Sequence, residues 1–306
     1  MPEIVSIGEC MVEFFCDGPM AQAATFTKAC GGDTLNLLVA ASRLGSSTGY
    51  VTRVGDDPFA RFLLEAWRAE GIDTRCAPLV PGFNGIYFIS LLEGGEREFT
   101  YYRKASAPSR MTPDDLDPDY LGSAKIVHSS GITQAISPSA RATVRRAFSI
   151  ARDRGAKVSF DPNVRPKLWS VEEAREAFEE VLPHVDILLL GAPEESQALG
   201  LPADAEGVIR ACRDRGVRVV VVKAGGQGVV VGTADQVRRV PAYSAGPIVD
   251  TTGAGDAFDG AFLHGFCAGM HAFEAARLGA VVAGLKCRGR GAVQSLPHRD
   301  EVMAHW

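Results

Sequence analysis

A glycine-rich segment with an acidic residue lies near the C-terminal end of the chain. It reads Asp-Thr-Thr-Gly-Ala-Gly-Asp-Ala-Phe over residues 250–258, and the residues after it have helical composition. Glycines let the backbone approach a ligand closely, and the free N–H groups at a helix N-terminus attract phosphate. The loop at residues 253–256 therefore favours a bound phosphate group.

The carboxylate of Asp256 follows these glycines directly and permits two interpretations. It can cap the helix by accepting a hydrogen bond from the backbone. It can also accept the proton of a substrate hydroxyl, while the adjacent N–H groups stabilise charge that develops on a phosphoryl group. The local sequence leaves both interpretations open.

A second glycine-rich segment follows the apolar run at residues 217–222. It contains Lys223, Gly225, Gly226 and Gly228. On local sequence alone, such a segment suits a turn from a strand into a hairpin. The sequence has no G-x-x-x-x-G-K-[ST] motif, and no G-x-G-x-x-G follows a strand, so an ordinary P-loop is excluded.

Composition and charge restrict the classes of partner. The 306 residues are 46% hydrophobic and 23% charged, and a net charge of -5 gives no reason to expect a nucleic-acid partner. The seven cysteines are odd in number, widely spread and form no C-x-x-C pair, so they indicate neither a zinc site nor a disulfide framework and suit the cytoplasm. The sequence shows neither a secretory leader nor an apolar run of about 20 residues, so we expect no membrane segment. Any anion that the protein binds must therefore be held by a local site.

Short apolar runs alternate with helical segments along the chain. The runs are continuously apolar, which is typical of strands that are covered on both faces, and they occupy residues 4–7, 49–54, 126–128, 157–160, 187–190 and 217–222. The predicted helices occupy residues 35–44, 58–70, 140–154, 171–182 and 205–215. This order predicts an α/β fold with a mostly parallel central sheet.

Two regions depart from this alternation. Residues 9–30 lack a helical pattern, and residues 85–102 indicate two strands around a turn at residues 93–96. Ile86, Phe88, Phe99 and Tyr101 alternate with other residues, so we expect them to form one covering face. We therefore predict one domain over residues 1–306, with a small β-rich lid built from approximately residues 9–30 and 82–104. The same apolar alternation favours pairing of lids in a homodimer or higher homo-oligomer.

The whole string at residues 250–258, followed by Gly260, closely resembles the C-terminal signature of PfkB-type, ribokinase-like carbohydrate kinases. Counterparts of the N-terminal signature are present at residues 31–36, 44–45, 54–57 and 71–72. The resemblance covers nearly the whole chain. It implies a ribokinase-like three-layer sandwich, ATP as phosphoryl donor and Mg²⁺ as its metal, with Asp256 as catalytic base and residues 253–255 as the anion hole.

The same resemblance places further residues at the nucleotide and the metal. It implies a nucleotide site formed by Asn163, Arg165, Lys223, Gly225, Gly226, Gly228, Gly253 and Gly255. An Asn-x-x-Glu segment lies near the metal in this family, but here Gly191 replaces the Asn and only Glu194 is retained. Glu194 is therefore expected to act on the metal through water, and a solvated glutamate is the alternative.

Residues 101–107, which read Tyr-Tyr-Arg-Lys-Ala-Ser-Ala, resemble the 2-keto-3-deoxygluconate kinases within the family. Residues 128–133, 161–165 and 168–169 resemble loops of the same subgroup. The resemblance implies that the sugar contacts Gly32, Asn36, Tyr87, Tyr101, Arg103, Ile132 and Arg165. An arginine can bind a carboxylate through two parallel hydrogen bonds, so the expected product is the 6-phosphate of 2-keto-3-deoxygluconate.

Two other functions stay open. Asp33 stands where this subgroup more often has a small residue, and residues 288–292 resemble ribokinases or fructokinases equally well. A neutral sugar is therefore an alternative substrate. A sensor that binds nucleotide or sugar without catalysis is a non-enzymatic alternative, against which the presence of Asp256 argues.

Overall fold

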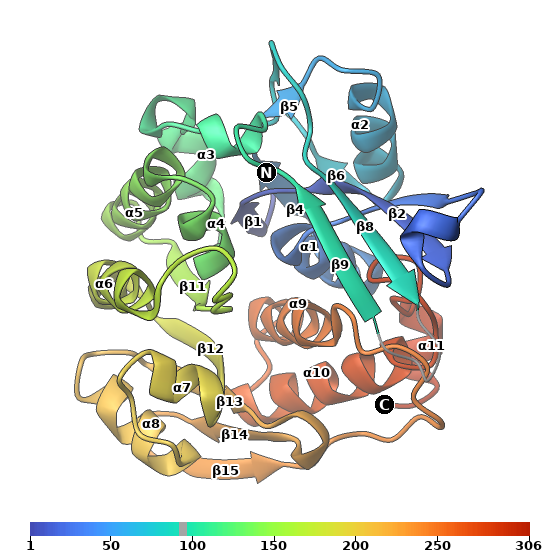
Figure 1. Cartoon of the computed structure of the whole chain (residues 1–306). Helices are drawn as coiled ribbons and strands as arrows, with labels where there is room; N and C mark the ends of the chain where they lie inside the picture. Colours follow the sequence, from blue (N-terminus) through green and yellow to red (C-terminus); the bar gives the residue numbers. More distant parts are fainter. Residues whose placement is uncertain (92–96) are drawn as a thin grey trace.

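A computed structural model describes residues 1–91 and 97–306. Its largest feature is a nine-stranded sheet (Figure 1). In spatial order the strands are β15 (Val237–Val240), β14 (Val229–Gly232), β13 (Val219–Lys223), β12 (Ile187–Gly191), β11 (Lys157–Asp161), β10 (Ile126–Ser130), β1 (Ile4–Ile7), β4 (Thr48–Val51) and β6 (Ile72–Asp73). Strands β13 to β6 are mutually parallel, and β14 and β15 add antiparallel pairs at one edge.

Helices cover both faces of this sheet. One apolar cluster joins it to α1 (Asp33–Leu44), α2 (Ala60–Ala69), α9 (Ala254–Cys267) and α10 (Ala272–Lys286). A second cluster joins the other face to α3 (Pro118–Ser123), α5 (Pro138–Asp153), α6 (Val171–Val181) and α8 (Ala205–Arg213). The shorter helices are α4 (Gly131–Ala135), α7 (Glu194–Ala198) and α11 (Arg299–Met303).

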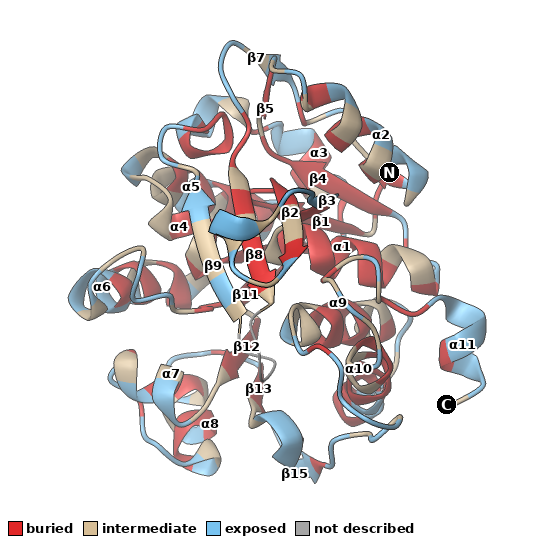
Figure 2. Cartoon of the chain, turned by 45° about the vertical axis from the view of Figure 1, so that its right-hand side comes forward, coloured by how far each residue is buried: buried red, intermediate tan, exposed pale blue. Residues whose placement is uncertain are grey.

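Alternate residues of each central strand face opposite layers. In β12, Ile187 and Leu189 belong to one cluster, whereas Leu188 and Leu190 belong to the other. Because both faces are buried, these strands are apolar throughout, as Figure 2 shows for the centre of the molecule. The predicted α/β three-layer sandwich with a mostly parallel sheet is confirmed.

A separate four-stranded sheet lies across one end of the sandwich (Figure 1). Its strands, in order, are β3 (Thr27–Gly31), β2 (Met11–Asp17), β8 (Ile86–Leu91) and β9 (Arg97–Tyr102). They come from the two segments that were predicted to form a β-rich lid, and we call this sheet the lid. The hairpin of β8 and β9 is antiparallel as predicted, whereas its expected turn at residues 93–96 lies outside the described residues.

The register of the hairpin corrects one expectation. Tyr101 pairs with Tyr87 and Phe99 with Ile89, so these four side chains share one face. Ile86 and Phe88 lie on the opposite face, because side chains alternate along a strand and the turn sets which residues pair. The predicted single covering face is therefore divided between the two sides of the lid.

Some boundaries also differ from the prediction. The run at residues 49–54 is interrupted: β4 ends at Val51, and β5 (Val54–Gly55) pairs instead with β7 (Leu79–Val80) in a separate two-stranded sheet. The interruption leaves the Thr52 N–H to bond the carbonyl of Cys76 at 3.1 Å. Across residues 1–91 and 97–306, no helix has the length and apolar character needed to cross a membrane.

Candidate active site

A cavity of about 890 Å³ opens at the carboxyl ends of the parallel strands, between them and the lid. The strand order reverses between β1 and β10, and ligands in open α/β sheets bind at such a point. Most of the predicted site residues line this cavity: Gly32, Asn36, Tyr87, Tyr101, Arg103, Ile132, Asn163, Arg165, Glu194, Lys223, Gly253, Ala254, Gly255 and Asp256.

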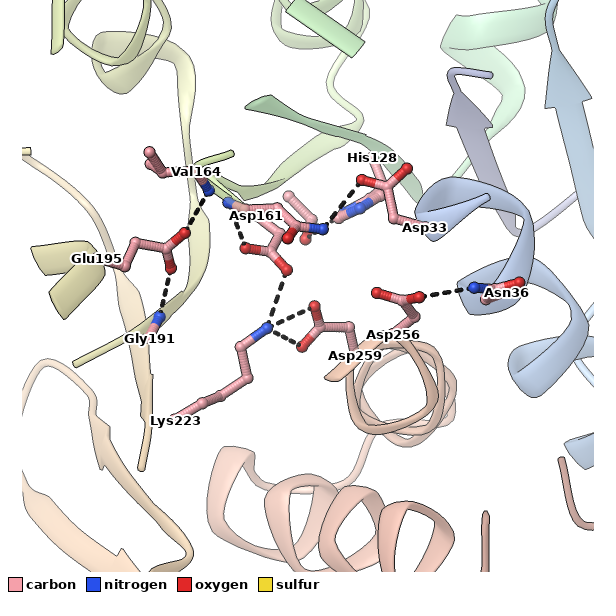
Figure 3. Close-up of polar contacts among 12 residues, drawn as sticks. Asp33, Asn36, His128, Asp161, Val164, Gly191, Glu195, Lys223, Asp256 and Asp259 are labelled. Carbon is pink, nitrogen blue, oxygen red and sulfur yellow. Dashed lines mark hydrogen bonds and ion pairs between the residues drawn. The ribbon is translucent and has the colours of Figure 1, made fainter. Parts of the chain in front are cut away.

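Asp256 lies in the first turn of α9 and does not cap that helix. The N-cap is Gly253, whose φ of 75° is left-handed and suits glycine. The Asp256 carboxylate instead accepts a hydrogen bond from Asn36 Nδ2 on α1 at 2.7 Å (Figure 3). Among the described residues no hydrogen bond engages the other carboxylate oxygen, and Asp256 lines the cavity, which fits the base better than the cap.

Close packing of α1 against α9 makes that contact possible. A Cβ atom added to Gly260 would lie 2.3 Å from the carbonyl oxygen of Leu37, so only glycine fits where the two helices meet. Gly260 follows Asp256 by one turn, and Leu37 follows Asn36 directly. The glycine therefore sets the distance between Asn36 and Asp256.

The pKa of Asp256 suits a proton acceptor near neutral pH. Burial is the main cause that raises this pKa to about 7, and the negative charge of Asp33 adds to it. The hydrogen bond from Asn36 opposes the shift. A general base works best when its pKa lies near the working pH.

The start of α9 offers backbone donors. The N–H of Ala254 already bonds the carbonyl of Thr251 at 3.1 Å. Within the described part of the chain, no hydrogen bond engages the N–H groups of Gly255 and Asp256. Free N–H groups in the first turn, together with the helix dipole, form an anion site. Gly255 and Asp256 therefore fit this role better than Ala254.

Lys223 is the centre of a buried ion cluster (Figure 3). Its ammonium lies 2.9 Å from a carboxylate oxygen of Asp161 and 2.9 Å from one of Asp259. Burial by itself lowers the pKa of Lys223, but the two carboxylates raise it above its ordinary value. The cluster ties the ends of β11 and β13 to α9. A Cβ on Gly255 would lie 3.8 Å from the ammonium, so this positive charge also adjoins the anion loop.

Asp33 contributes a further carboxylate to the cavity. Its oxygens accept hydrogen bonds from the Thr34 N–H at 2.9 Å and from Asn163 Nδ2 at 3.2 Å. Asn163 itself has a φ of 40°, and its N–H bonds Asp161 at 3.0 Å. Burial raises the pKa of Asp33. Asp33 therefore connects the predicted sugar side of the cavity, at α1, with the predicted nucleotide side.

Of two adjacent glutamates, the one that was not predicted, Glu195, is the less exposed and the better bonded. Glu194 lines the cavity with an exposed side chain. Glu195 accepts hydrogen bonds from the N–H groups of Gly191 and Val164, both at 2.6 Å (Figure 3). Burial, with the nearby charge of Asp161, raises the pKa of Glu195 to about 7. Glu195 thus holds together the loops after β11 and β12.

Arg103 reaches the cavity from the lid. It forms an ion pair with Glu9, which follows β1 and is almost completely buried. Burial raises the pKa of Glu9, and the charge of Arg103 offsets part of that rise. Within the described residues, the buried Nε of Arg103 has no hydrogen-bond partner. Arg165, exposed in the loop after β11, also lines the cavity, as do Arg97 and Lys223.

Gly225, Gly226 and Gly228 are not among the residues that line the cavity. They belong to the turn between β13 and β14, which closes through a bond from the Ala224 N–H to the carbonyl of Gly228 at 2.9 Å. This is the hairpin alternative stated above. The predicted contact of these three glycines with the nucleotide would require part of the nucleotide to extend beyond the cavity, and it stays a prediction.

Sequence reasoning missed Asp161, Asp259, Glu195, Glu9 and Arg97 as residues of this region. The sequence positions of two of them could have indicated a place in the site. Asp161 ends a strand of the parallel sheet, and Asp259 follows Asp256 by three residues on one helix. Nothing in the sequence indicates that Glu195, and not Glu194, bonds the loops after β11 and β12. No group of three or more His, Cys, Asp or Glu residues arranged to hold a metal occurs within residues 1–91 and 97–306.

Comparisons with known proteins agree with this geometry. A model described as pfkB family carbohydrate kinase matches residues 1–299. The 2-dehydro-3-deoxygluconokinase of Thermoproteus tenax is 35% identical over 98% of this chain and 93% of its own length. Fructokinase-1 of Zea mays is 32% identical over 98% of this chain and 96% of its own. A crystal structure assigned to ribokinase II of E. coli, in complex with ATP and Mg²⁺, has a TM-score of 0.91 at 27% identity and covers 99% of this chain and 98% of that one.

Proposed function

The chain belongs to the PfkB family of carbohydrate kinases, and we propose that within this family it phosphorylates 2-keto-3-deoxygluconate at its terminal hydroxyl. The supporting observation is that Arg103 and Arg165 line the same cavity as Asp256. Arg103 also keeps a buried Nε without a partner among the described residues. A sugar acid supplies the carboxylate that such a donor lacks, whereas a neutral hexose does not.

We propose that Asp256 is the catalytic base. Its carboxylate, held by Asn36, takes the proton from the acceptor hydroxyl as the oxygen attacks the phosphoryl group. The N–H groups of Gly255 and Asp256 stabilise the negative charge on the phosphoryl oxygens, and the ammonium of Lys223 adds positive potential nearby.

The cavity residues fit ATP and Mg²⁺. When bound, ATP supplies the phosphoryl group and Mg²⁺ offsets the charge on its phosphates. Asn163, Arg165 and Lys223 line the cavity on the side of the loops after β11 and β13, where they would hold the phosphates. Magnesium keeps several of its waters when it binds to proteins, so Glu194 would hold the ion by accepting a hydrogen bond from one of these waters.

Phosphorylation of fructose is the second candidate. Asp33 places a carboxylate in the cavity that can accept hydrogen bonds from sugar hydroxyls, and one of the relatives is named fructokinase. The two arginines favour the sugar acid. A sensor without catalysis is not favoured, because Asp256 and its supporting contact with Asn36 are both in place.

We also propose that the lid mediates a homodimer. The face of the lid turned away from the cavity has a cluster of aromatic rings, formed by Phe14, Phe26, Phe88 and Tyr102. Phe26 is 36% exposed and Tyr102 is 60% exposed. Phe14 already packs against Phe59, and a second lid would bury the exposed rings of Phe26 and Tyr102. Analytical ultracentrifugation tests the proposal: a homodimer should sediment with twice the mass of the chain, and a monomer would refute it. The location of the protein in the cytoplasm stays a prediction from the sequence.

The function is tested by ADP release with a panel of 2-keto-3-deoxygluconate, ribose, fructose and an inositol-derived keto acid. The proposal expects the highest kcat/KM for 2-keto-3-deoxygluconate. A clear preference for fructose or ribose would refute the assignment of a sugar acid and leave the family membership intact.

Arg103 is then replaced to test the carboxylate contact. Arg103→Met should lower kcat/KM for the sugar acid by roughly a hundredfold and for neutral sugars by much less, because charged hydrogen bonds contribute about 1.5–3 kcal/mol. The same change leaves the buried Glu9 carboxylate without its cation, which could destabilise the fold. The double variant Glu9→Gln with Arg103→Met removes this unpaired charge, so a loss of activity that persists in it reports lost recognition of the sugar. Arg61→Met, at a side chain that is 88% exposed, is the matched control. Equal losses for acid and neutral sugars would contradict the contact.

A further inference from the structure

Arg97, the first residue of β9, connects the lid to the anion loop. One of its guanidinium nitrogens, Nη1, lies 2.7 Å from Asp250 Oδ1 and donates to Thr252 Oγ1 at 2.9 Å. Asp250 and Thr252 begin the segment that leads through Gly253 into α9. β9 starts at the end that points toward this segment (Figure 1).

The Asp250 segment is held firmly on its other sides. Asp250 accepts hydrogen bonds from the N–H groups of Thr252 at 2.7 Å and Gly291 at 2.9 Å. Its carbonyl accepts a hydrogen bond from Lys286 Nζ at 2.7 Å, and Lys286 is completely buried. Lys286 belongs to α10 and stays with the sandwich, whereas Arg97 belongs to the lid.

Arg97 shares its strand with predicted sugar contacts. Arg97, Phe99 and Tyr101 lie on one face of β9, and all three line the cavity. Arg103 follows the end of the same strand. A sugar held against Tyr101 and Arg103 therefore fixes the position of β9, and β9 fixes the guanidinium that contacts Asp250 and Thr252.

We propose that Arg97 is a positioning residue that couples the sugar site to the anion loop. Sugar bound under the lid stabilises the Asp250–Gly253 segment through Arg97, so that the N–H groups at the start of α9 are in place for phosphate. Since such coupling is reciprocal, sugar and nucleotide strengthen each other's binding. The inference rests on the sugar and nucleotide sites proposed above.

The first test measures binding of a non-hydrolysable ATP analogue by calorimetry, with and without the sugar that the wild-type enzyme phosphorylates best. We expect sugar to tighten analogue binding about tenfold in the wild type, a typical coupling. In Arg97→Gln the ratio should fall to near one, and Arg97→Lys should restore part of it. Glu98→Gln, at the exposed neighbouring position on β9, should keep the wild-type ratio. Equal ratios in the wild type and Arg97→Gln, or a wild-type ratio of one, would overturn the proposal.

A second test needs no ligand and so separates this inference from the choice of substrate. Hydrogen exchange of the backbone amides of Asp250, Thr252 and Ala254, which are hydrogen-bonded in the structure, should be faster in Arg97→Gln than in the wild type and in Glu98→Gln. Thr252→Val, which removes one of the two contacts and keeps the charges, should show an intermediate rate. Unchanged exchange in Arg97→Gln would overturn the proposal even if the panel of sugars gave no substrate.

Discussion

The activity of the enzyme should fall as the pH is lowered through about 7. Burial and the charge of Asp33 raise the pKa of Asp256 from 3.8 to about 7. This rise of roughly three units corresponds to at most about 4 kcal/mol between the two protonation states, because each unit is 1.36 kcal/mol. A base must be ionised, so activity is lost when Asp256 gains a proton. At pH 6 about a tenth of the molecules would have an ionised Asp256.

The assay is kcat/KM for the sugar between pH 5.5 and 8.5 at saturating ATP. We expect the acid limb to have a slope of one and a midpoint near pH 7. Asp33→Asn removes the neighbouring negative charge and should move this midpoint to lower pH. Asp204→Asn is a matched control, because Asp204 caps α8 through the Gly207 N–H and does not line the cavity.

A profile that stays flat down to pH 5.5 would refute the reasoning, since an ordinary aspartate would remain ionised there. A midpoint that is unchanged in Asp33→Asn would show that the charge of Asp33 does not contribute to the raised pKa of Asp256.

The remaining predictions concern stability and packing. Asp256→Asn should raise the melting temperature more at pH 8 than at pH 5. Because the pKa of Asp256 is higher in the folded chain than in the unfolded chain, the wild type loses stability as the pH rises from about 4 to about 7, and asparagine does not. Equal gains at both pH values would contradict this. Lys223→Met should lower the free energy of unfolding by about 3–5 kcal/mol in urea titrations, because Asp161 and Asp259 lose their shared cation; an unchanged midpoint would argue against the cluster. Gly260→Ala should lower both turnover and melting temperature by separating α1 from α9, and normal turnover would show that Asn36 is not placed by this packing.

The central sheet and its helices could be predicted from the sequence because burial on both faces requires continuous apolar runs. The register of the lid could not, because alternation along β8 and β9 does not say which residues pair across the hairpin. Phe88 and Phe99 therefore lie on opposite faces although both fit the alternating pattern.

The candidate active site likewise contains residues that the sequence could predict and residues that it could not. Asp256 and its glycines form a contiguous motif, so the sequence alone could single them out, whereas only the structure shows that Asp256 contacts Asn36 and does not cap α9. Glu195, Arg97 and Glu9 act through partners that are distant in sequence. Glu195 meets Val164, Arg97 meets Asp250, and Glu9 meets Arg103. Such pairs depend on the folded chain, and no local spacing predicts them.

The most direct test of the account is the turnover of Asp256→Asn, measured as ADP release with the best sugar and compared with Asp204→Asn. The variant keeps the size of the side chain and an oxygen that can accept from Asn36, and it removes the proton acceptor. We expect kcat to fall by about 10²–10⁴, with the affinity for a non-hydrolysable ATP analogue changed by less than about threefold. Turnover near that of the wild type would contradict the assignment of Asp256 as the base.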